Sequence, residues 1–316
     1  MKFYTSTDKD LTEDHKKLFA QGAGTIASDG NFSAALWFEN TPIYNDEHIG
    51  TIGGLEIDHS PAASNFLTAC AQYLHQQHNC TTVVGPMNGN TWLQHRLILE
   101  STGRDPFFME PMEQEHFYDT FLSAGFLLFS EYSSASIDLT IDQKNYERLE
   151  NKLTKSGIRI RKIDMENFTD DLNALFDLSL ISFSKNFLYT PISREQFLAK
   201  YLAARDHIDP DFVLVAERDG QLVAYVFALP DLAAPQFGKQ PALIVKTLAA
   251  LPDHTLSGIG TLLVAKAQQI AKDKGYTEAI HALQYESNSS KRISKRFTAE
   301  TFRRYGLMVK SFPHSS

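Results

Sequence analysis

The sequence is poor in cysteine: its 316 residues include two, Cys70 and Cys80. Two thiols are too few for a disulfide framework and too widely spaced for a zinc knuckle, so both are expected to be small buried apolar side chains. Long apolar runs are also missing, since no stretch approaches the ~20 residues that cross a bilayer. The first residues are polar and acidic where a signal peptide needs a basic start and an apolar run. These absences predict a cytoplasmic protein that does not enter a membrane.

Positive charge is scarce overall, with 30 Lys and Arg against 38 Asp and Glu and a net charge of -8. An acidic chain is a poor nonspecific ligand of nucleic acid or anionic lipid, so neither is expected as a partner. Basic residues nevertheless gather between 291 and 310, where seven Lys and Arg face the single Glu300. This window predicts a local anionic ligand, with solvated surface charge as the alternative.

The length favours two domains at about 150 residues each. In the second part of the chain, β-rich runs at 212–217 and 222–228 flank Asp219-Gly220 and predict a hairpin. The apolar run 242–251 predicts a buried strand, and the segment between Gly258 and Gly275 predicts an amphipathic helix. The other elements expected here are helices at 172–183 and 194–204 and a strand at 278–283 that is parallel to 242–251.

The first part of the chain repeats this order of elements without residue identity. Strands are expected at 33–38 and 48–57, a helix at 62–78, and a strand at 82–85. The polar stretch 141–156 predicts a connecting helix. The domains expected from this pattern are 1–140 and 157–316, joined by the connecting segment 141–156.

A glycine pair stands between the strand 242–251 and the helix that follows it. Gly258 and Gly260 lie where successive unpaired backbone N–H groups and the helix dipole converge, which is a geometry that binds phosphate. A Walker loop needs Gly-Lys-Ser/Thr, and a dinucleotide fingerprint needs a third glycine near the start of the fold. Neither is present, so the loop predicts a phosphate site of another kind.

These residues resemble the GNAT N-acetyltransferase superfamily, in which a strand ending near a proline precedes Arg/Gln-x-x-Gly-x-Gly/Ala and a helix. Thr255 takes the Arg/Gln place, and Gly258 and Gly260 match the two small positions. The resemblance covers about 158–310 by element order, with the first part as a degenerate copy. It implies an α/β (α+β) fold of two GNAT-like domains, each a mixed, mostly antiparallel sheet flanked by helices, with a parallel strand-helix-strand unit at the acyl-CoA site. Pro61 stands in the corresponding loop of the first part and lacks an N–H, so no coenzyme is expected there.

The resemblance implies acetyl-CoA as the acyl donor and no metal. The glycine loop would bind the pyrophosphate and the end of the preceding strand the pantetheine arm, while Lys291, Arg292, Lys295 or Arg296 could meet the 3′-phosphate. The residues assigned to the coenzyme in this way are Ala249, Ala250, Leu251, Thr255, Leu256, Ser257, Gly258, Ile259, Gly260, Thr261 and Asn288.

With this donor, an amine must attack the thioester directly, and removing its ammonium proton is the harder task. Glu217 and Glu286 are the candidate bases, with a plain surface carboxylate as the alternative for each. The backbone N–H groups of Ala250 and Leu251 would stabilise the oxyanion. Lys295 occupies the place of the tyrosine that protonates the thiolate in the family. Tyr285 and Tyr305 are the nearest replacements, and each could instead be structural.

The acceptor is expected to be a small-molecule or peptide amine. The aromatic side chains at 183, 187, 189 and 197 line its pocket or, alternatively, pack in the core. Two further functions stay open. One is an acyl-CoA-binding regulatory protein without catalysis, and the other is an aminoacyl transferase that uses charged tRNA, against which the acidic composition argues. The sequence makes no prediction about the oligomeric state.

Overall fold

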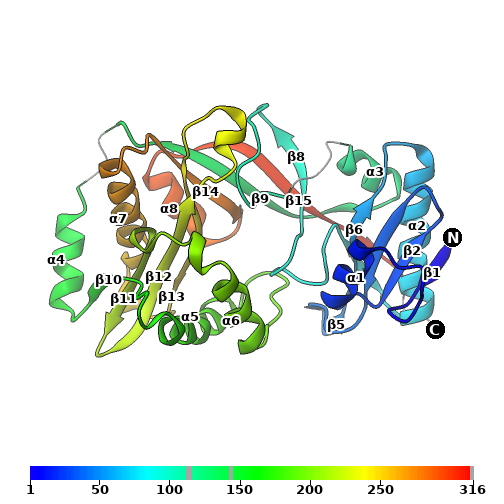
Figure 1. The fold of residues 1–316 in the computed structure, drawn as a ribbon, viewed down its shortest axis with the longest axis horizontal. Coiled ribbons are helices and arrows are strands. Elements are labelled where there is room, and N and C mark those ends of the chain that lie inside the picture. Colours follow the sequence, from blue (N-terminus) through cyan, green and yellow to red (C-terminus); the bar gives the residue numbers. More distant parts are fainter. Residues whose placement is uncertain (112–115, 142–144, 314–316) are drawn as a thin grey trace.

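The computed structural model describes residues 1–111, 116–141 and 145–313, which form two halves joined by one continuous sheet (Figure 1). The first half contains β1 (Lys2–Tyr4), α1 (Glu13–Ala20), β2 (Thr25–Ser28), β3 (Ser33–Trp37), β4 (Ile43–Tyr44), β5 (Glu47–His48), β6 (Gly50–Glu56), α2 (Pro61–His78), β7 (Thr82–Gly85), β8 (Leu97–Ser101), α3 (Phe117–Ser123) and β9 (Leu127–Asp138). The second half contains α4 (Glu147–Lys155), β10 (Arg159–Lys162), α5 (Phe168–Phe183), α6 (Arg194–Ala203), η1 (Arg205–His207), η2 (Pro210–Phe212), β11 (Val213–Arg218), β12 (Gln221–Pro230), η3 (Ala234–Phe237), β13 (Leu243–Ala250), η4 (His254–Leu256), α7 (Ile259–Asp273), β14 (Glu278–Tyr285), α8 (Ser289–Arg296) and β15 (Glu300–Ser311).

The sheet has the same organisation in its two halves. Its strand order is β1-β2-β3-β6-β7-β15-β9-β14-β13-β12-β11-β10, and β8 pairs with β15 beside this path. The named pairs along this path are antiparallel apart from β6·β7 and β13·β14, which are parallel. The predicted fold class, a mixed and mostly antiparallel sheet with a parallel strand-helix-strand unit, is therefore confirmed.

The two halves exchange their last strands. The strand β9, which ends the first half, pairs with β14, whereas β15, which ends the second half, pairs with β7. Between them β9 and β15 pair with each other from Ser136↔Glu300 to Leu127↔Val309, across the middle of the molecule (Figure 1). The division into domains 1–140 and 157–316 therefore stays a prediction. In the structure, each of these segments supplies one strand to the sheet of the other.

Local sequence explains where the main elements begin and end. The hairpin between β11 and β12 turns at Asp219 and Gly220, both with positive φ (53° and 76°), as a type I′ turn requires. Ser193 and Gln196 form a reciprocal capping box that starts α6. The predicted connecting helix is α4, while part of the stretch in which it was expected, 142–144, lies outside the described residues.

Helices cover both faces of the sheet in the second half. One core packs α7 and α4 against the strands, and another packs α5 and α6 against the opposite face. In the first half, α2 packs against β3 and β6. The core formed in this way contains Cys70 and Cys80, whose thiols are free and buried as predicted. Burial raises the pKa of Cys80 to about 11. Within the described ranges, no helix combines the length and apolarity needed to cross a membrane.

Candidate active site

A gap opens in the sheet between β13 and β14. These strands pair only from Leu243↔Ala279 to Val245↔His281 and then diverge, although both continue for several residues. The divergence begins at a bulge, because consecutive residues of β12 pair with Val245 and Thr247 and leave Lys246 without a partner. The bulge thus separates two strands in the middle of the sheet and exposes their edges to each other.

The gap leads into a cavity of about 680 Å³ with walls from both halves. The second half provides residues of β13, β14 and the segment after α5, whereas the first half provides 91–96 and 109–111. Two hydrogen bonds fix the first-half wall: Trp92 Nε1 donates to the Thr190 carbonyl at 2.8 Å, and Lys200 Nζ donates to the Trp92 carbonyl at 2.9 Å. The first half is therefore a structural part of this site.

The start of α7 leaves a run of backbone amides free. The turn η4 uses the earlier amides of the loop, since the amide of Thr255 donates to Asp253 and that of Ser257 to the His254 carbonyl. Gly258 is the N-cap and has no side chain to accept a hydrogen bond. Over the described chain, no acceptor is recorded for the amides of Gly258, Ile259, Gly260 and Thr261. Four consecutive donors at a helix start form an anion-binding geometry.

Gly258 and Gly260 are required first for packing, because neighbouring side chains occupy the space where a Cβ would lie. A Cβ on Gly258 would lie 2.8 Å from Leu149 Cδ1, and a Cβ on Gly260 would lie 3.1 Å from Leu248 Cδ2 and 3.2 Å from Ile293 Cδ1. Gly258 also has a φ of 96°, which L side chains rarely adopt. The space over the glycines is thus filled by α4, β13 and α8, and the amides rather than this space form the site.

Arg218 contacts the loop at Thr255, which lacks a long side chain of its own. Its guanidinium donates to Thr255 Oγ1 at 2.8 Å and to Asp253 Oδ2 at 2.8 Å. The hydrogen bond from Arg218 holds the pKa of Asp253 well below its usual range. A cation therefore reaches this loop from the β11-β12 hairpin instead of from the motif position.

The basic helix α8 lies beside the start of α7. Arg296 Nη1 is 3.4 Å from Thr261 Oγ1, while Arg292 and Lys295 are exposed to solvent. Lys291 is already used, because it forms an ion pair with Glu286 at 2.9 Å. Asn288 lines the cavity at the end of β14.

The hydrogen bonds between β12 and β13 show that one of the two predicted oxyanion donors, the amide of Leu251, is wrong. The amide of Leu251 donates to the Val223 carbonyl at 2.9 Å, so it is not available to a ligand. Because an antiparallel ladder alternates, the amide of Ala249 also faces β12, whereas the amides of Leu248 and Ala250 face the gap. Ala250 therefore fits the predicted role, and Leu251 does not.

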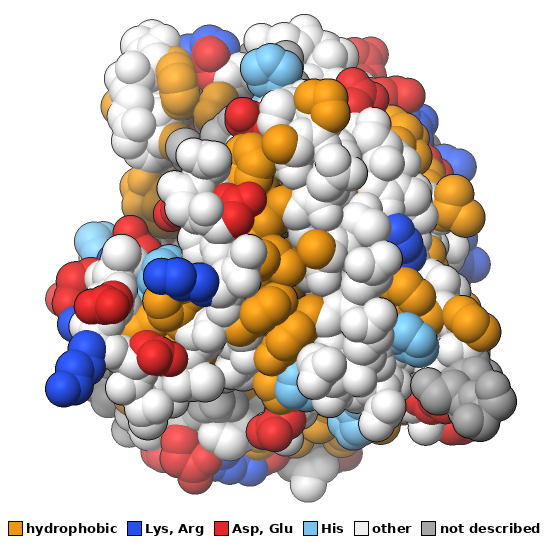
Figure 2. Space-filling view, turned by 90° about the vertical axis from the view of Figure 1, so that its right-hand side faces the viewer, with side chains coloured by type: hydrophobic (Ala, Val, Ile, Leu, Met, Phe, Trp, Pro, Cys, Tyr) orange, Lys and Arg blue, Asp and Glu red, His pale blue; other side chains and the backbone are white. Residues whose placement is uncertain are grey.

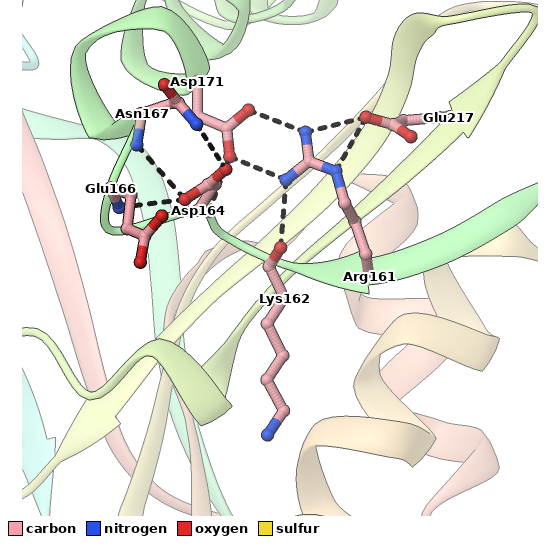
Figure 3. Close-up of polar contacts among 7 residues, drawn as sticks. All are labelled: Arg161, Lys162, Asp164, Glu166, Asn167, Asp171 and Glu217. Carbon is pink, nitrogen blue, oxygen red and sulfur yellow. Dashed lines mark hydrogen bonds and ion pairs between the residues drawn. The ribbon is translucent and has the colours of Figure 1, made fainter.

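Glu217, a predicted base, lies in an ion-pair cluster away from the cavity lining. Arg161 donates to Glu217 Oε1 at 2.8 Å and binds Asp171 through two hydrogen bonds of 2.7 Å (Figure 3). Asp171 also accepts from the amide of Asp164. This cluster joins β10, β11 and α5, so the surroundings of Glu217 indicate a structural role.

We expect Glu217→Gln to lower the free energy of unfolding by about 1–2 kcal/mol, because the charge-assisted bonds to Arg161 are weakened in a half-buried pair. Urea unfolding measures this effect. Glu13→Gln, in the exposed pair of Glu13 with Lys16, is the matched control and should change stability little. Loss of acyl transfer in Glu217→Gln at unchanged stability would instead restore Glu217 as the base.

The other two predicted catalytic residues are also engaged elsewhere. Glu286 is ion-paired with Lys291; although burial alone would raise its pKa, hydrogen bonds and Lys291 hold this pKa below its ordinary value. Tyr305 is fully buried, where its hydroxyl contacts Glu110 and lies 3.0 Å from Ser134 Oγ. Burial raises the pKa of Tyr305 far above that of a free tyrosine. Of the two tyrosines considered, Tyr285 lines the cavity and Tyr305 does not.

His95 lines the cavity, although no motif or periodicity in the sequence marks it as a functional residue. It is 8% exposed, and its Nδ1 lies 2.8 Å from the Leu93 carbonyl, which assigns the hydrogen to Nδ1. Nε2 then keeps its lone pair, and it has no hydrogen-bond partner in the described structure. Burial, with the charges of Arg96 and Lys200, holds the pKa of His95 well below 6.5. An unpartnered neutral imidazole in a cavity can accept a proton.

The predicted aromatic group is divided between cavity and core. Phe183, Phe187 and Tyr189 line the cavity, and the Tyr189 hydroxyl has no partner among the residues described. Phe197 is 2% exposed and packs in the core between α5 and α6. Three members of this group thus line the cavity and one packs in the core, while a role of the three in an acceptor pocket stays a prediction.

The sheet opens at the bulge of β13, and α7 starts beside this opening without a side-chain cap. Together with the parallel strand-helix-strand unit β13-α7-β14, these features are typical of the class of GNAT-type folds. Residues 172–296 match the acetyltransferase (GNAT) family, so the second half contains a GNAT domain. The resemblance to the GNAT superfamily that was inferred from the glycine loop is confirmed. The GNAT fold supports acyltransferase activity in general. No curated protein matches the sequence.

Solved structures show the same fold at low sequence identity. A GCN5-related N-acetyltransferase from Sphaerobacter thermophilus is 13% identical with a TM-score of 0.55, over 92% of this chain and 81% of that one. A tandem GNAT protein from the clavulanic acid biosynthesis pathway is 12% identical with a TM-score of 0.53, over 100% and 99%. A fungal multi-domain GH3 β-N-acetylglucosaminidase with a GCN5-related glucosamine N-acetyltransferase region is 15% identical with a TM-score of 0.56, over 98% and 38%. The whole chain is thus consistent with a tandem GNAT organisation.

Proposed function

We propose that the protein is an N-acyltransferase that moves the acetyl group of acetyl-CoA to an amine. The observation that carries the proposal is the run of free amides at 258–261, placed at the start of α7 beside the gap between β13 and β14. Backbone donors at a helix start suit a pyrophosphate, and the gap-facing edge of β13 suits an extended arm with amide groups. The exposed cations of α8 adjoin the same helix start and suit a further phosphate.

The residues of the cavity would divide the work of direct transfer. Bound acetyl-CoA supplies a thioester, in which the C–S bond breaks as the C–N bond to the acceptor forms. The amide of Ala250 faces the gap and would stabilise the developing oxyanion. His95 Nε2 would take the proton that the attacking nitrogen loses, and Tyr285 would return a proton to the departing thiolate. Glu217, Glu286 and Tyr305 are not part of this proposal.

Acetyl-CoA should stabilise the folded protein, because a ligand at 100 times its Kd adds about 2.7 kcal/mol to the free energy of unfolding. A thermal-shift series with acetyl-CoA and with an acetyl thioester of pantetheine measures this effect. We expect a clear shift with the whole coenzyme and little with the arm alone, since the arm lacks the pyrophosphate for the 258–261 amides. Absence of both a shift and a calorimetric signal with every acyl-CoA would contradict the proposal.

A coenzyme-binding regulatory protein is the second candidate, favoured by the engagement of Tyr305 in the core and by Lys295 at the family's tyrosine place. Turnover of acetyl-CoA with a panel of amines separates it from an enzyme. An aminoacyl transferase is less favoured. On the face shown in Figure 2, the end of the molecule formed by the first half, acidic and basic side chains are dispersed around apolar ones, and the net charge of -8 argues against an extended contact with tRNA.

A further inference from the structure

Three cationic side chains line the candidate cavity from three different elements. Arg96 comes from the first-half wall, Lys200 from α6, and Lys246 from the bulge of β13. The geometry points to an acceptor that carries an anionic group, a carboxylate or a phosphate, beside its nucleophilic amine, with Arg96, Lys200 and Lys246 as the binding site of that group. This inference rests on the proposed function, since it names the substrate class of the same cavity.

None of the three cations has a carboxylate partner among the described residues. Lys200 Nζ donates to the Trp92 carbonyl at 2.9 Å, and Lys246 Nζ lies 3.1 Å from Met109 Sδ. The guanidinium of Arg96 lies 4.0 Å over the Tyr132 ring, and its Nε is buried without a hydrogen-bond partner. These contacts leave the positive charges uncompensated and leave donor capacity unused.

Among the described lining residues, the single carboxylate, Glu110, does not compensate them. Glu110 has a fully buried side chain that forms an ion pair with Arg303 and also contacts the Tyr305 hydroxyl. Its charge is thus shared with a cation outside the lining. Over the described residues, the cavity lining therefore carries an excess of positive charge.

Grouped charges of one sign are costly unless a ligand neutralises them. Burial lowers the pKa of Lys246 to about 8, and the charges of Lys200 and Arg96 act in the same direction. An oxyanion bound among these side chains would relieve this repulsion and accept hydrogen bonds from the Arg96 guanidinium and the ammonium groups. A simple monoamine would add a further positive charge to the cluster.

The same charges would prepare the acceptor for attack. Nearby cations disfavour an ammonium ion, so the acceptor nitrogen would lose its proton more readily in the cavity than in water. His95 is adjacent to Arg96 in the sequence and lines the same cavity, which offers an unpartnered Nε2 for that proton. One cluster would thus fix the anionic end of the acceptor and assist deprotonation of its amine end.

Matched pairs of amines test the inference, with binding measured by calorimetry and transfer by release of the CoA thiol. O-phosphoethanolamine is compared with ethanolamine, and 6-aminohexanoate with hexylamine, so that the two pairs distinguish phosphate from carboxylate. We expect the anionic member of at least one pair to bind at least ~10-fold more tightly, as charge-assisted hydrogen bonds allow. Equal or tighter binding of the members that lack an anionic group, or no binding of either anionic member, would overturn the inference.

Lys246→Met keeps the length of the side chain and removes its charge. It should weaken the preferred anionic amine at least ~10-fold, whereas Lys185→Met, an exposed lysine outside the cavity lining, should not. If Lys246→Met weakens acetyl-CoA and spares the anionic amine, the cations serve the coenzyme and the inference fails. If acetyl-CoA does not bind the wild-type protein, the proposed function fails, while the amine series without coenzyme still tests the anion site.

Discussion

Replacement of His95 by glutamine is expected to lower kcat by about 10²-fold, the lower end of the usual contribution of a positioned proton acceptor, because a pKa held well below 6.5 makes His95 a weak base. Glutamine is similar in size and retains a donor for the Leu93 carbonyl, but it has no basic lone pair in the place of Nε2. The proposed coenzyme site is formed by other elements, so binding of acetyl-CoA should persist. Release of the CoA thiol at saturating acceptor measures kcat, and the thermal shift with acetyl-CoA reports coenzyme binding.

His254→Gln is the matched control for His95, because the His254 side chain is 97% exposed. The pH dependence offers a second readout. Since burial, Arg96 and Lys200 keep the pKa of His95 well below 6.5, this side chain should stay neutral as the pH falls through 6.5. Activity should therefore not decline at that pH on account of His95. A wild-type kcat in His95→Gln would exclude it as the base.

The elements of the second half were predictable because each has a local signal. The Asp219-Gly220 turn, the glycine at each end of α7 and the apolar run of β13 determine their elements within a few residues along the chain. The strand exchange had no such signal, because β9 and β15 find their partners through pairings far apart in sequence. The fold class could thus be predicted, and the way the halves join could not.

The site was harder to predict because distant neighbours decide what each side chain does. Glu217 is 56 residues from Arg161, and Tyr305 is 195 residues from Glu110, and these partners engage both predicted catalytic groups. His95 lies in an irregular segment without periodicity or motif, and its role depends on the cavity wall that this segment forms. The run of free amides at 258–261 could be predicted because these amides are consecutive in the chain.

The gap between β13 and β14 is open, whereas the corresponding gap between β6 and β7 in the first half is filled. The parallel strands β6 and β7 also pair over only two positions before they diverge. Here Asn88 Oδ1 accepts from the amide of Gly54 at 2.9 Å, and the amide of Met87 donates to the Ile52 carbonyl at 2.8 Å. Ser60 caps the start of α2 and Pro61 contributes no amide. The segment that fills this gap continues into 91–96, the wall of the cavity in the second half.

Gly258→Ala is expected to remove most of the affinity for acetyl-CoA and to abolish its thermal shift. The added Cβ would lie 2.8 Å from Leu149 Cδ1, and the residue would have to keep a φ of 96°. Strain at such a φ costs about 1–2 kcal/mol for an L residue, so the turn should relax to another conformation. The four amides at 258–261 would then no longer converge on one anion. Calorimetry with acetyl-CoA measures the loss directly.

Gly275→Ala, at the other end of α7, separates this effect from backbone strain alone. Gly275 has a φ of 90° and an added Cβ would meet nothing within 4 Å, so the substitution carries a similar conformational cost without the contact to Leu149. Both variants should lower the unfolding temperature, but only Gly258→Ala should lose the coenzyme. If Gly258→Ala binds acetyl-CoA as tightly as Gly275→Ala does, the start of α7 does not hold the pyrophosphate. A rearranged turn at Gly258 could not leave the contact between the 258–261 amides and the pyrophosphate intact.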